Sequence, residues 1–124
     1  MVSLECSILN MASKKIKKLL ISNRGEIACK IILCAKKLKI PTLAIYSDDD
    51  INSLHVQLAD EAVPVPGSLV SETYMNSSAI IKIAKKYKAN AIHPGYGLLS
   101  ENADFVELVE KNKLIFIGPK SQIV

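Results

Sequence analysis

The feature that most constrains the fold is a regular alternation of short apolar runs with amphipathic segments along the chain. The apolar runs are short, and polar or proline-bearing turn residues follow each of them. Runs of this kind are typical of strands that are covered on both faces in a parallel sheet. The predicted strands lie at residues 16–22, 42–46, 62–65, 89–93 and 114–117.

Segments with helical periodicity separate these strands. In the first segment, apolar residues recur at i, i+4, i+7 and i+11 and form one amphipathic stripe, namely Ile27, Ile31, Cys34 and Leu38. We expect Asn23 to cap this helix, and Pro41 to prevent its continuation. The predicted helices cover residues 25–37, 51–59, 72–88 and 102–111.

Strands that alternate with helices are joined by crossovers, and the crossover helices cover the faces of the sheet. The pattern therefore predicts an α/β fold: a doubly wound, mostly parallel five-stranded sheet with helices on both faces, similar to a Rossmann fold. The 124 residues suit one domain. We expect residues 1–15 to be a disordered leader and residues 16–124 to form the domain.

Charge and hydropathy exclude several classes of protein. Charged residues interrupt every apolar run well before the length that a membrane-spanning helix needs. The net charge is +4, and the basic residues are concentrated in the segment 13–40. This basic segment has no interleaved aromatic residues, and only 5% of the chain is aromatic, so nucleic-acid binding is not favoured. We expect neither a nucleic-acid nor a membrane partner.

The three cysteines have no spacing that indicates a metal site or a disulfide framework. Cys6, Cys29 and Cys34 include no Cys-x-x-Cys pair, and we expect them to be small buried residues of a protein in a reducing compartment. The first residues are too weakly apolar for a secretory signal. These features predict a cytoplasmic or mitochondrial-matrix protein rather than a secreted one.

One polar cluster follows the first predicted strand, at residues 22–26 (SNRGE). A helix N-terminus with Arg24 beside it can hold an anion, and Asp48 lies near the place of a dinucleotide fold's ribose-binding acid. The loop has one glycine instead of three, however, and Glu26 would repel a pyrophosphate. The alternative hypothesis is that Arg24 and Glu26 form an ion pair that locks the strand–helix junction.

A second cluster follows the fourth predicted strand, at residues 93–97 (HPGYG) and 100–102 (SEN). Two glycines beside an aromatic ring permit close approach of the backbone to a ligand, and Glu101 lies in the same turn region. His93 has the side chain of an acid–base group, but its place after an apolar strand favours a structural role. Because carboxyl ends of parallel strands meet at one edge of a sheet, both clusters are expected at that edge.

The two clusters belong to a longer series of short sequence matches. The series comprises NRGEIA at 23–28, AIYSD at 44–48, His55, ADEA at 59–62, ETY at 72–74, AIHPGYG at 91–97, LSEN at 99–102 and FIGP at 116–119. In order and spacing, the stretch 18–118 resembles the N-terminal domain of biotin carboxylase, the ATP-grasp enzyme of biotin-dependent carboxylases.

This resemblance implies an ATP-dependent ligase reaction. In the family, ATP activates bicarbonate to carboxyphosphate, Mg²⁺ neutralises the phosphates, and a biotin tethered to a carrier protein is carboxylated. The resemblance assigns Tyr96, Gly97 and Glu101 to the biotin and bicarbonate cleft. It assigns the scaffold of that cleft to six further residues: Asn23, Arg24, Gly25, Glu26, His93 and Gly95.

The resemblance also implies partners. They are the ATP-grasp domain of the same enzyme, a biotin carboxyl carrier protein or domain, a carboxyltransferase and a second copy in a homodimer. At helix positions where relatives present arginines and an acid to the dimer partner, this chain has Lys30, Leu33 and Lys37.

The family pattern continues beyond residue 119 into the parts that bind ATP and Mg²⁺, so we expect the 124 residues alone to bind none of these cofactors and to be inactive. The alternatives are a truncated, non-catalytic binding module and a stand-alone nucleotide-binding Rossmann domain.

Overall fold

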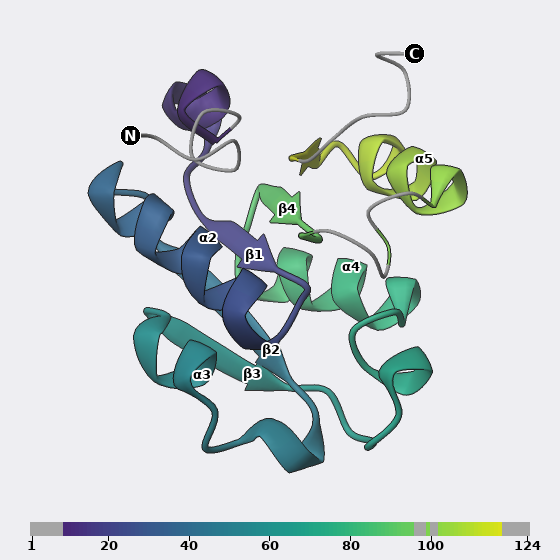
Figure 1. Ribbon diagram of the computed structural model, residues 1–124. Coiled ribbons are helices and arrows are strands. Elements are labelled where there is room, and N and C mark those ends of the chain that lie inside the picture. Colours follow the sequence, from purple (N-terminus) through teal and green to yellow (C-terminus); the bar gives the residue numbers. More distant parts are fainter. Residues whose placement is uncertain (1–8, 96–98, 100–101, 118–124) are drawn as a thin grey trace.

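The computed structural model describes residues 9–95, 99 and 102–117, which contain one five-stranded sheet (Figure 1). All four pairs of neighbouring strands are parallel, in the order β3-β2-β1-β4-β5. The predicted fold class is confirmed. The strands are β1 (Leu19–Ile21), β2 (Thr42–Tyr46), β3 (Glu61–Pro64), β4 (Ala91–His93) and β5 (Ile115–Phe116).

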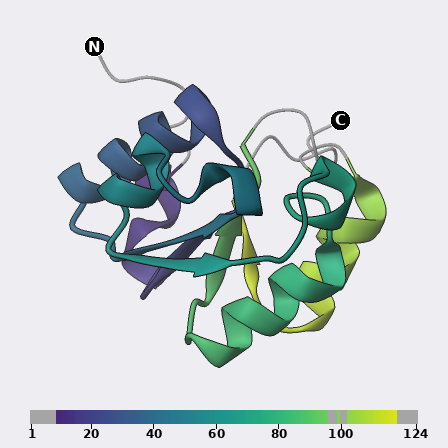
Figure 2. The same cartoon turned by 90° about the horizontal axis from the view of Figure 1, so that it is seen from below.

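Helices cover both faces of the sheet (Figure 2). One face packs against α2 (Gly25–Lys37) and α3 (Leu54–Leu58), and the other packs against α4 (Ser77–Lys86) and α5 (Ala103–Lys111). The central strand β1 shows why the apolar runs are continuous: Leu19 and Ile21 join the α2 core, Leu20 joins the α4–α5 core, and none is exposed. A strand with no solvent face needs no polar alternation.

The order of the strands creates a switch point between β1 and β4. From β1 the chain winds outward to β2 and β3, and it then returns to the other side of β1 to form β4 and β5. Crossovers on the two sides leave the sheet in opposite directions, which opens a crevice at the carboxyl ends of β1 and β4. The residues that follow these two strands are therefore the first place to look for a site.

Apolar periodicity predicted the bounds of some helices and strands correctly and those of others incorrectly. The helix 25–37 and the strand 42–46 have the predicted bounds. The helix predicted over 51–59 is present but shorter, because α3 begins only after the 3-10 turn η2 (Asp48–Asp50) and the extended backbone of Ser53.

The helix predicted over 72–88 is also too long. A 3-10 turn, η3 (Val70–Glu72), comes first, and Asn76 then caps α4 by accepting a hydrogen bond from the Ala79 amide at 3.1 Å.

The N-terminal segment differs from the prediction of a disordered leader. Residues 9–12 are helical and continue into the 3-10 turn η1 (Ser13–Lys15), and Leu9 is fully buried against the α2 core. Burial of an apolar side chain gives this segment a reason to fold that periodicity could not reveal. Residues 1–8 lie outside the described part of the chain.

The cysteines also correct an expectation. Cys29 is a free thiol, but Cys34, buried in the α2 core, is disulfide-bonded. The prediction of unpaired cysteines is therefore wrong for Cys34, and cysteine chemistry gives no argument for a reducing compartment. Cys6 lies outside the described residues. Within the described part of the chain, no helix has the length and apolar character to cross a membrane.

Three helices end in the same way, each with a lysine in a left-handed backbone conformation. Lys39, Lys88 and Lys113 have φ of 60°, 64° and 62° and follow the ends of α2, α4 and α5. In each case the next residue donates its amide to a carbonyl five residues back, the bond of a Schellman cap. Glycine is the residue best suited to this position, so each lysine carries a conformational cost.

We predict that Lys88→Gly raises the free energy of unfolding by about 0.5–1 kcal/mol, because glycine relieves the left-handed strain. The matched control is Lys82→Gly in the middle of α4, which should lower it by about 1 kcal/mol. Urea denaturation of both variants measures the difference. A loss of stability in both would contradict this account of the helix ends.

Candidate functional site

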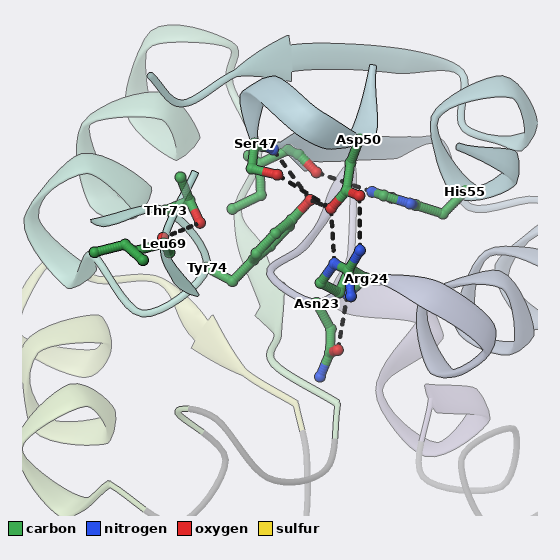
Figure 3. Close-up of polar contacts among 9 residues, drawn as sticks. Asn23, Arg24, Ser47, Asp50, His55, Leu69, Thr73 and Tyr74 are labelled. Carbon is green, nitrogen blue, oxygen red and sulfur yellow. Dashed lines mark hydrogen bonds and ion pairs between the residues drawn. The ribbon is translucent and has the colours of Figure 1, made fainter. Parts of the chain in front are cut away.

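A buried carboxylate, Asp50, is the centre of the polar contacts at the carboxyl edge of the sheet (Figure 3). Arg24, between β1 and α2, donates from Nε and Nη2 to its two oxygens, both at 2.7 Å. Tyr74, in the segment before α4, donates its hydroxyl to Oδ2 at 2.6 Å. Ser47, at the end of β2, donates its hydroxyl to the same oxygen at 3.2 Å. Asp50 thus joins three separate crossovers.

The contacts of Asp50 fix the charges of the cluster. The hydrogen bonds from Arg24 hold the pKa of the Asp50 carboxyl well below its usual range, and the same contact raises the pKa of Arg24. Burial, with the hydrogen bond to Asp50, raises the pKa of Tyr74 to about 12. At neutral pH the cluster is therefore an ion pair with a neutral tyrosine, and none of the three groups is suited to exchange protons.

Asn23 connects this cluster to the end of β4. Its Nδ2 donates to the carbonyl of Pro94 at 2.6 Å, and its Oδ1 accepts from the Arg24 amide at 2.7 Å. The prediction that Asn23 caps α2 is wrong: Arg24 occupies the cap position, with no side-chain cap, because the Asn23 amide is turned toward the neighbouring strand end. Asn23 and Pro94 lie on the two sides of the switch point.

Two glycines of the predicted scaffold have left-handed backbones, for different reasons. Gly95 has φ of 73°, and a Cβ there would lie 2.4 Å from Asn23 Nδ2 and 2.9 Å from Ile27 Cγ2. Gly25 has φ of 68° and nothing within 4 Å of such a Cβ. Gly95 is therefore required by both conformation and space, whereas Gly25 is required by conformation alone.

His93 braces the same turn. Its Nδ1 accepts a hydrogen bond from the Gly95 amide at 3.0 Å, so this nitrogen carries no proton, and only 1% of the residue is exposed. The amide of Ser22 donates to the His93 carbonyl at 3.1 Å, which extends the pairing of β1 with β4. The structure thus brings Asn23, Arg24, His93 and Gly95 together.

The other predicted scaffold residues face elsewhere. Glu26 pairs with Lys30 on the exposed side of α2, at 3.4 Å, so the hypothesis of an Arg24–Glu26 ion pair is wrong. Glu26 and Lys30 lie four residues apart and share one face of α2, whereas the side chain of Arg24 turns toward the segment that follows β2. Gly25 and Glu26 line a separate cavity of about 360 Å³ between α2 and α3, with Cys29, Ser53, Leu54 and His55.

The structure gives the remaining candidate groups structural partners. Asp48 accepts a hydrogen bond from the Gly67 amide at 3.2 Å, so the proposed ribose acid has a partner within the chain. His55 is buried and donates from Nε2 to the Ile45 carbonyl at 3.0 Å, and burial lowers its pKa. Among the residues that the structure describes, no cluster of His, Cys, Asp or Glu is arranged to hold a metal ion.

Sequence reasoning missed the residues that organise the edge, namely Ser47, Asp50 and Tyr74. Asp50 ends a run of three aspartates and Tyr74 lies inside the matched segment at 72–74, but neither pattern indicates a tertiary contact. Nothing in the local sequence indicates that Arg24 pairs with a residue 26 positions away. The cleft residues Tyr96, Gly97 and Glu101 lie outside the described residues.

The fold and this edge define a doubly wound α/β domain with a braced turn at its switch point. The family model of the biotin carboxylase N-terminal domain matches residues 15–124. The α subunit of mitochondrial methylcrotonoyl-CoA carboxylase from Dictyostelium discoideum is 50% identical over 111 residues, 90% of this chain. Biotin carboxylase 1 of Bacillus subtilis is 49% identical over 109 residues, 88% of this chain.

A solved structure shares the fold. The biotin carboxylase domain of Hydrogenobacter thermophilus 2-oxoglutarate carboxylase, a dimer in complex with MgADP, ADP and bicarbonate, has a TM-score of 0.81 at 44% identity over 87% of this chain and 24% of that one. The chain belongs to the family of biotin carboxylase N-terminal domains, which confirms the resemblance. It spans 16% of the Dictyostelium relative and 24% of the Bacillus one.

We predict that Asp50→Ala lowers the free energy of unfolding by about 2–3 kcal/mol at pH 7, because it leaves Arg24 and the Tyr74 hydroxyl without their acceptor. Glu26→Ala removes only an exposed pair and should change it by less than about 0.5 kcal/mol. Chemical denaturation of both variants tests this, and equal effects would contradict the assignment of Asp50 as the partner of Arg24.

We predict a pH dependence from His55. Because the folded state lowers its pKa below the ordinary value of 6.5, the unfolded chain takes up the proton first, and stability falls as the pH drops below that value. His55→Gln keeps a donor for the Ile45 carbonyl and should flatten this fall by up to about 1.4 kcal/mol per pH unit. Denaturation at pH 7.5 and 5.5 measures it, and parallel profiles would refute the assignment.

Proposed function

We propose that this domain works as the N-terminal part of a biotin carboxylase, which carboxylates carrier-bound biotin with ATP and bicarbonate. The observation that carries the proposal is the braced turn at the switch point. Pro94 and Gly95, held by Asn23 and His93, lead directly into Tyr96 and Gly97. Membership of the family supports this role for the turn.

The proposed site divides the work between this domain and the rest of the enzyme. Tyr96 would pack against the biotin ring, Gly97 would leave room for the ring, and Glu101 would lie beside the bicarbonate.

The proposed reaction uses ATP and Mg²⁺, and no cluster of His, Cys, Asp or Glu among the described residues is arranged to hold the metal. We assign both to the ATP-grasp domain, and we propose that the 124 residues alone have no turnover. A solved complex of the Hydrogenobacter biotin carboxylase domain with MgADP and bicarbonate supports the use of these groups by the complete enzyme.

The proposed partners follow from the same reaction. They are the ATP-grasp domain of the enzyme, a biotin carboxyl carrier protein or domain, a carboxyltransferase and a second copy of the enzyme. The Hydrogenobacter relative is a dimer, which supports the second copy. Relatives are mitochondrial or bacterial, which supports the mitochondrial matrix or the cytoplasm as the compartment.

We predict that residues 15–124 can replace the corresponding segment of Bacillus subtilis biotin carboxylase 1 without loss of its reaction. The chimera should retain biotin-dependent and bicarbonate-dependent ATP hydrolysis, which a coupled assay of ADP release measures. Within the chimera, Tyr96→Ala or Glu101→Ala should lower kcat/KM for biotin by about 10–100-fold, or about 1.4–2.8 kcal/mol.

One control variant and one check of folding make this test decisive. Asn112→Ala, at the C-terminal end of α5, removes a side-chain hydrogen bond to the Leu108 carbonyl and should leave kcat/KM unchanged. A chimera that is folded, as judged by circular dichroism, but hydrolyses no ATP in response to biotin would contradict the proposal.

A further inference from the structure

Hydrogen bonds at the two ends of Arg24, its guanidinium and its backbone amide, connect the segment after β2 to the end of β4. The Arg24 guanidinium donates two hydrogen bonds of 2.7 Å to the Asp50 carboxylate. The Arg24 backbone amide donates to Asn23 Oδ1 at 2.7 Å, and Asn23 Nδ2 donates to the Pro94 carbonyl at 2.6 Å. We call this path, from Asp50 through Arg24 and Asn23 to Pro94, the Asp50–Pro94 relay.

Each link of the relay is constrained by its surroundings. Asp50 is 4% exposed and is held by Tyr74 as well as by Arg24, so its carboxylate has little freedom to turn. Asn23 is also 4% exposed, and both ends of its amide are engaged. Buried polar groups that are fully paired are costly to displace, because displacement leaves an unpaired atom.

The relay ends where the fold places its crevice. Asn23 follows β1 and Pro94 follows β4, the two strands on either side of the switch point. The next residue, Gly95, has no room for a side chain because Asn23 Nδ2 occupies that space. The position of the Asn23 amide therefore sets the path of the backbone as it leaves β4.

We propose that Asp50 and Asn23 are positioning residues for the biotin site: Asp50 fixes Arg24, Arg24 fixes Asn23, and Asn23 fixes the turn at Pro94 and Gly95. Neither residue needs to touch the substrate. This inference rests on the proposed function for its link to biotin, but its structural part stands on the geometry of the described residues. A shift of the turn would weaken substrate binding more than it would slow the chemical step.

The structural part is tested in the 124-residue chain by amide hydrogen exchange at Gly95, whose amide bonds to His93 within the turn. Asn23→Ala and Asp50→Asn should each accelerate exchange at Gly95 by about tenfold more than exchange at the core amide of Val109, which reports the global loss of stability. The control is Asn76→Ala, which removes an asparagine with the same pair of backbone contacts and should leave Gly95 unchanged. Unchanged exchange at Gly95 in either test variant would overturn the proposal.

The double variant Asp50→Asn/Asn23→Ala separates a relay from two independent contacts. In a relay, removal of the last link makes the first link irrelevant to the turn, so the double variant should exchange no faster than Asn23→Ala alone. Independent contacts would instead multiply, to about 100-fold acceleration, and that result would overturn the relay.

The functional part is tested in the Bacillus chimera. Asn23→Ala and Asp50→Asn should raise KM for biotin by about 3–10-fold and change kcat by less than about twofold, whereas Asn76→Ala should change neither. Faster exchange at Gly95 with an unchanged KM would overturn the role in substrate positioning. An inactive parent chimera would instead refute the proposed function and leave the exchange result to decide the structural part.

Discussion

The structure depends on the pairing of one buried carboxylate, Asp50. A charge removed from water is costly unless donors surround it, and Asp50 has them from Arg24, Tyr74 and Ser47. These donors come from three different segments between strands. The requirement to satisfy one charge therefore fixes how three crossovers meet at the edge of the sheet, which apolar packing of the helices does not specify.

The apolar cores and the polar edge of the sheet have separate roles. The apolar strands and helix faces form two cores, one on each side of the sheet. The polar edge holds the turns in place, and its charges are locked by pairing. In the proposed function, this polar edge forms one wall of a cleft. In the proposed enzyme, the other wall belongs to the ATP-grasp domain.

Local sequence predicted those parts of the fold that local physics controls. The bounds of α2 and β2 follow from apolar spacing, and the parallel sheet follows from the alternation of strands and helices. In the segment 48–59, apolar spacing predicted too long a helix, because tertiary contacts of Asp50 and Asp48 compete with helix formation there. The burial of Leu9 is another long-range effect that periodicity could not show.

Local sequence is also insufficient to predict the contacts within the candidate site. Asn23, Arg24, His93 and Gly95 were predicted as scaffold because they match a family pattern, but their partners depend on the strand order. The pairing of Arg24 with Asp50, instead of with Glu26, follows only when β1 and β2 are neighbours in the sheet.

The most direct test of the account is a crystal structure of the Bacillus chimera with biotin and bicarbonate. The account predicts that the ureido ring of biotin lies against residues 95–97, at the carboxyl ends of β1 and β4, with the Asn23 amide still bonded to the Pro94 carbonyl. A biotin ring bound away from this switch point, or a turn that no longer contacts Asn23, would contradict it.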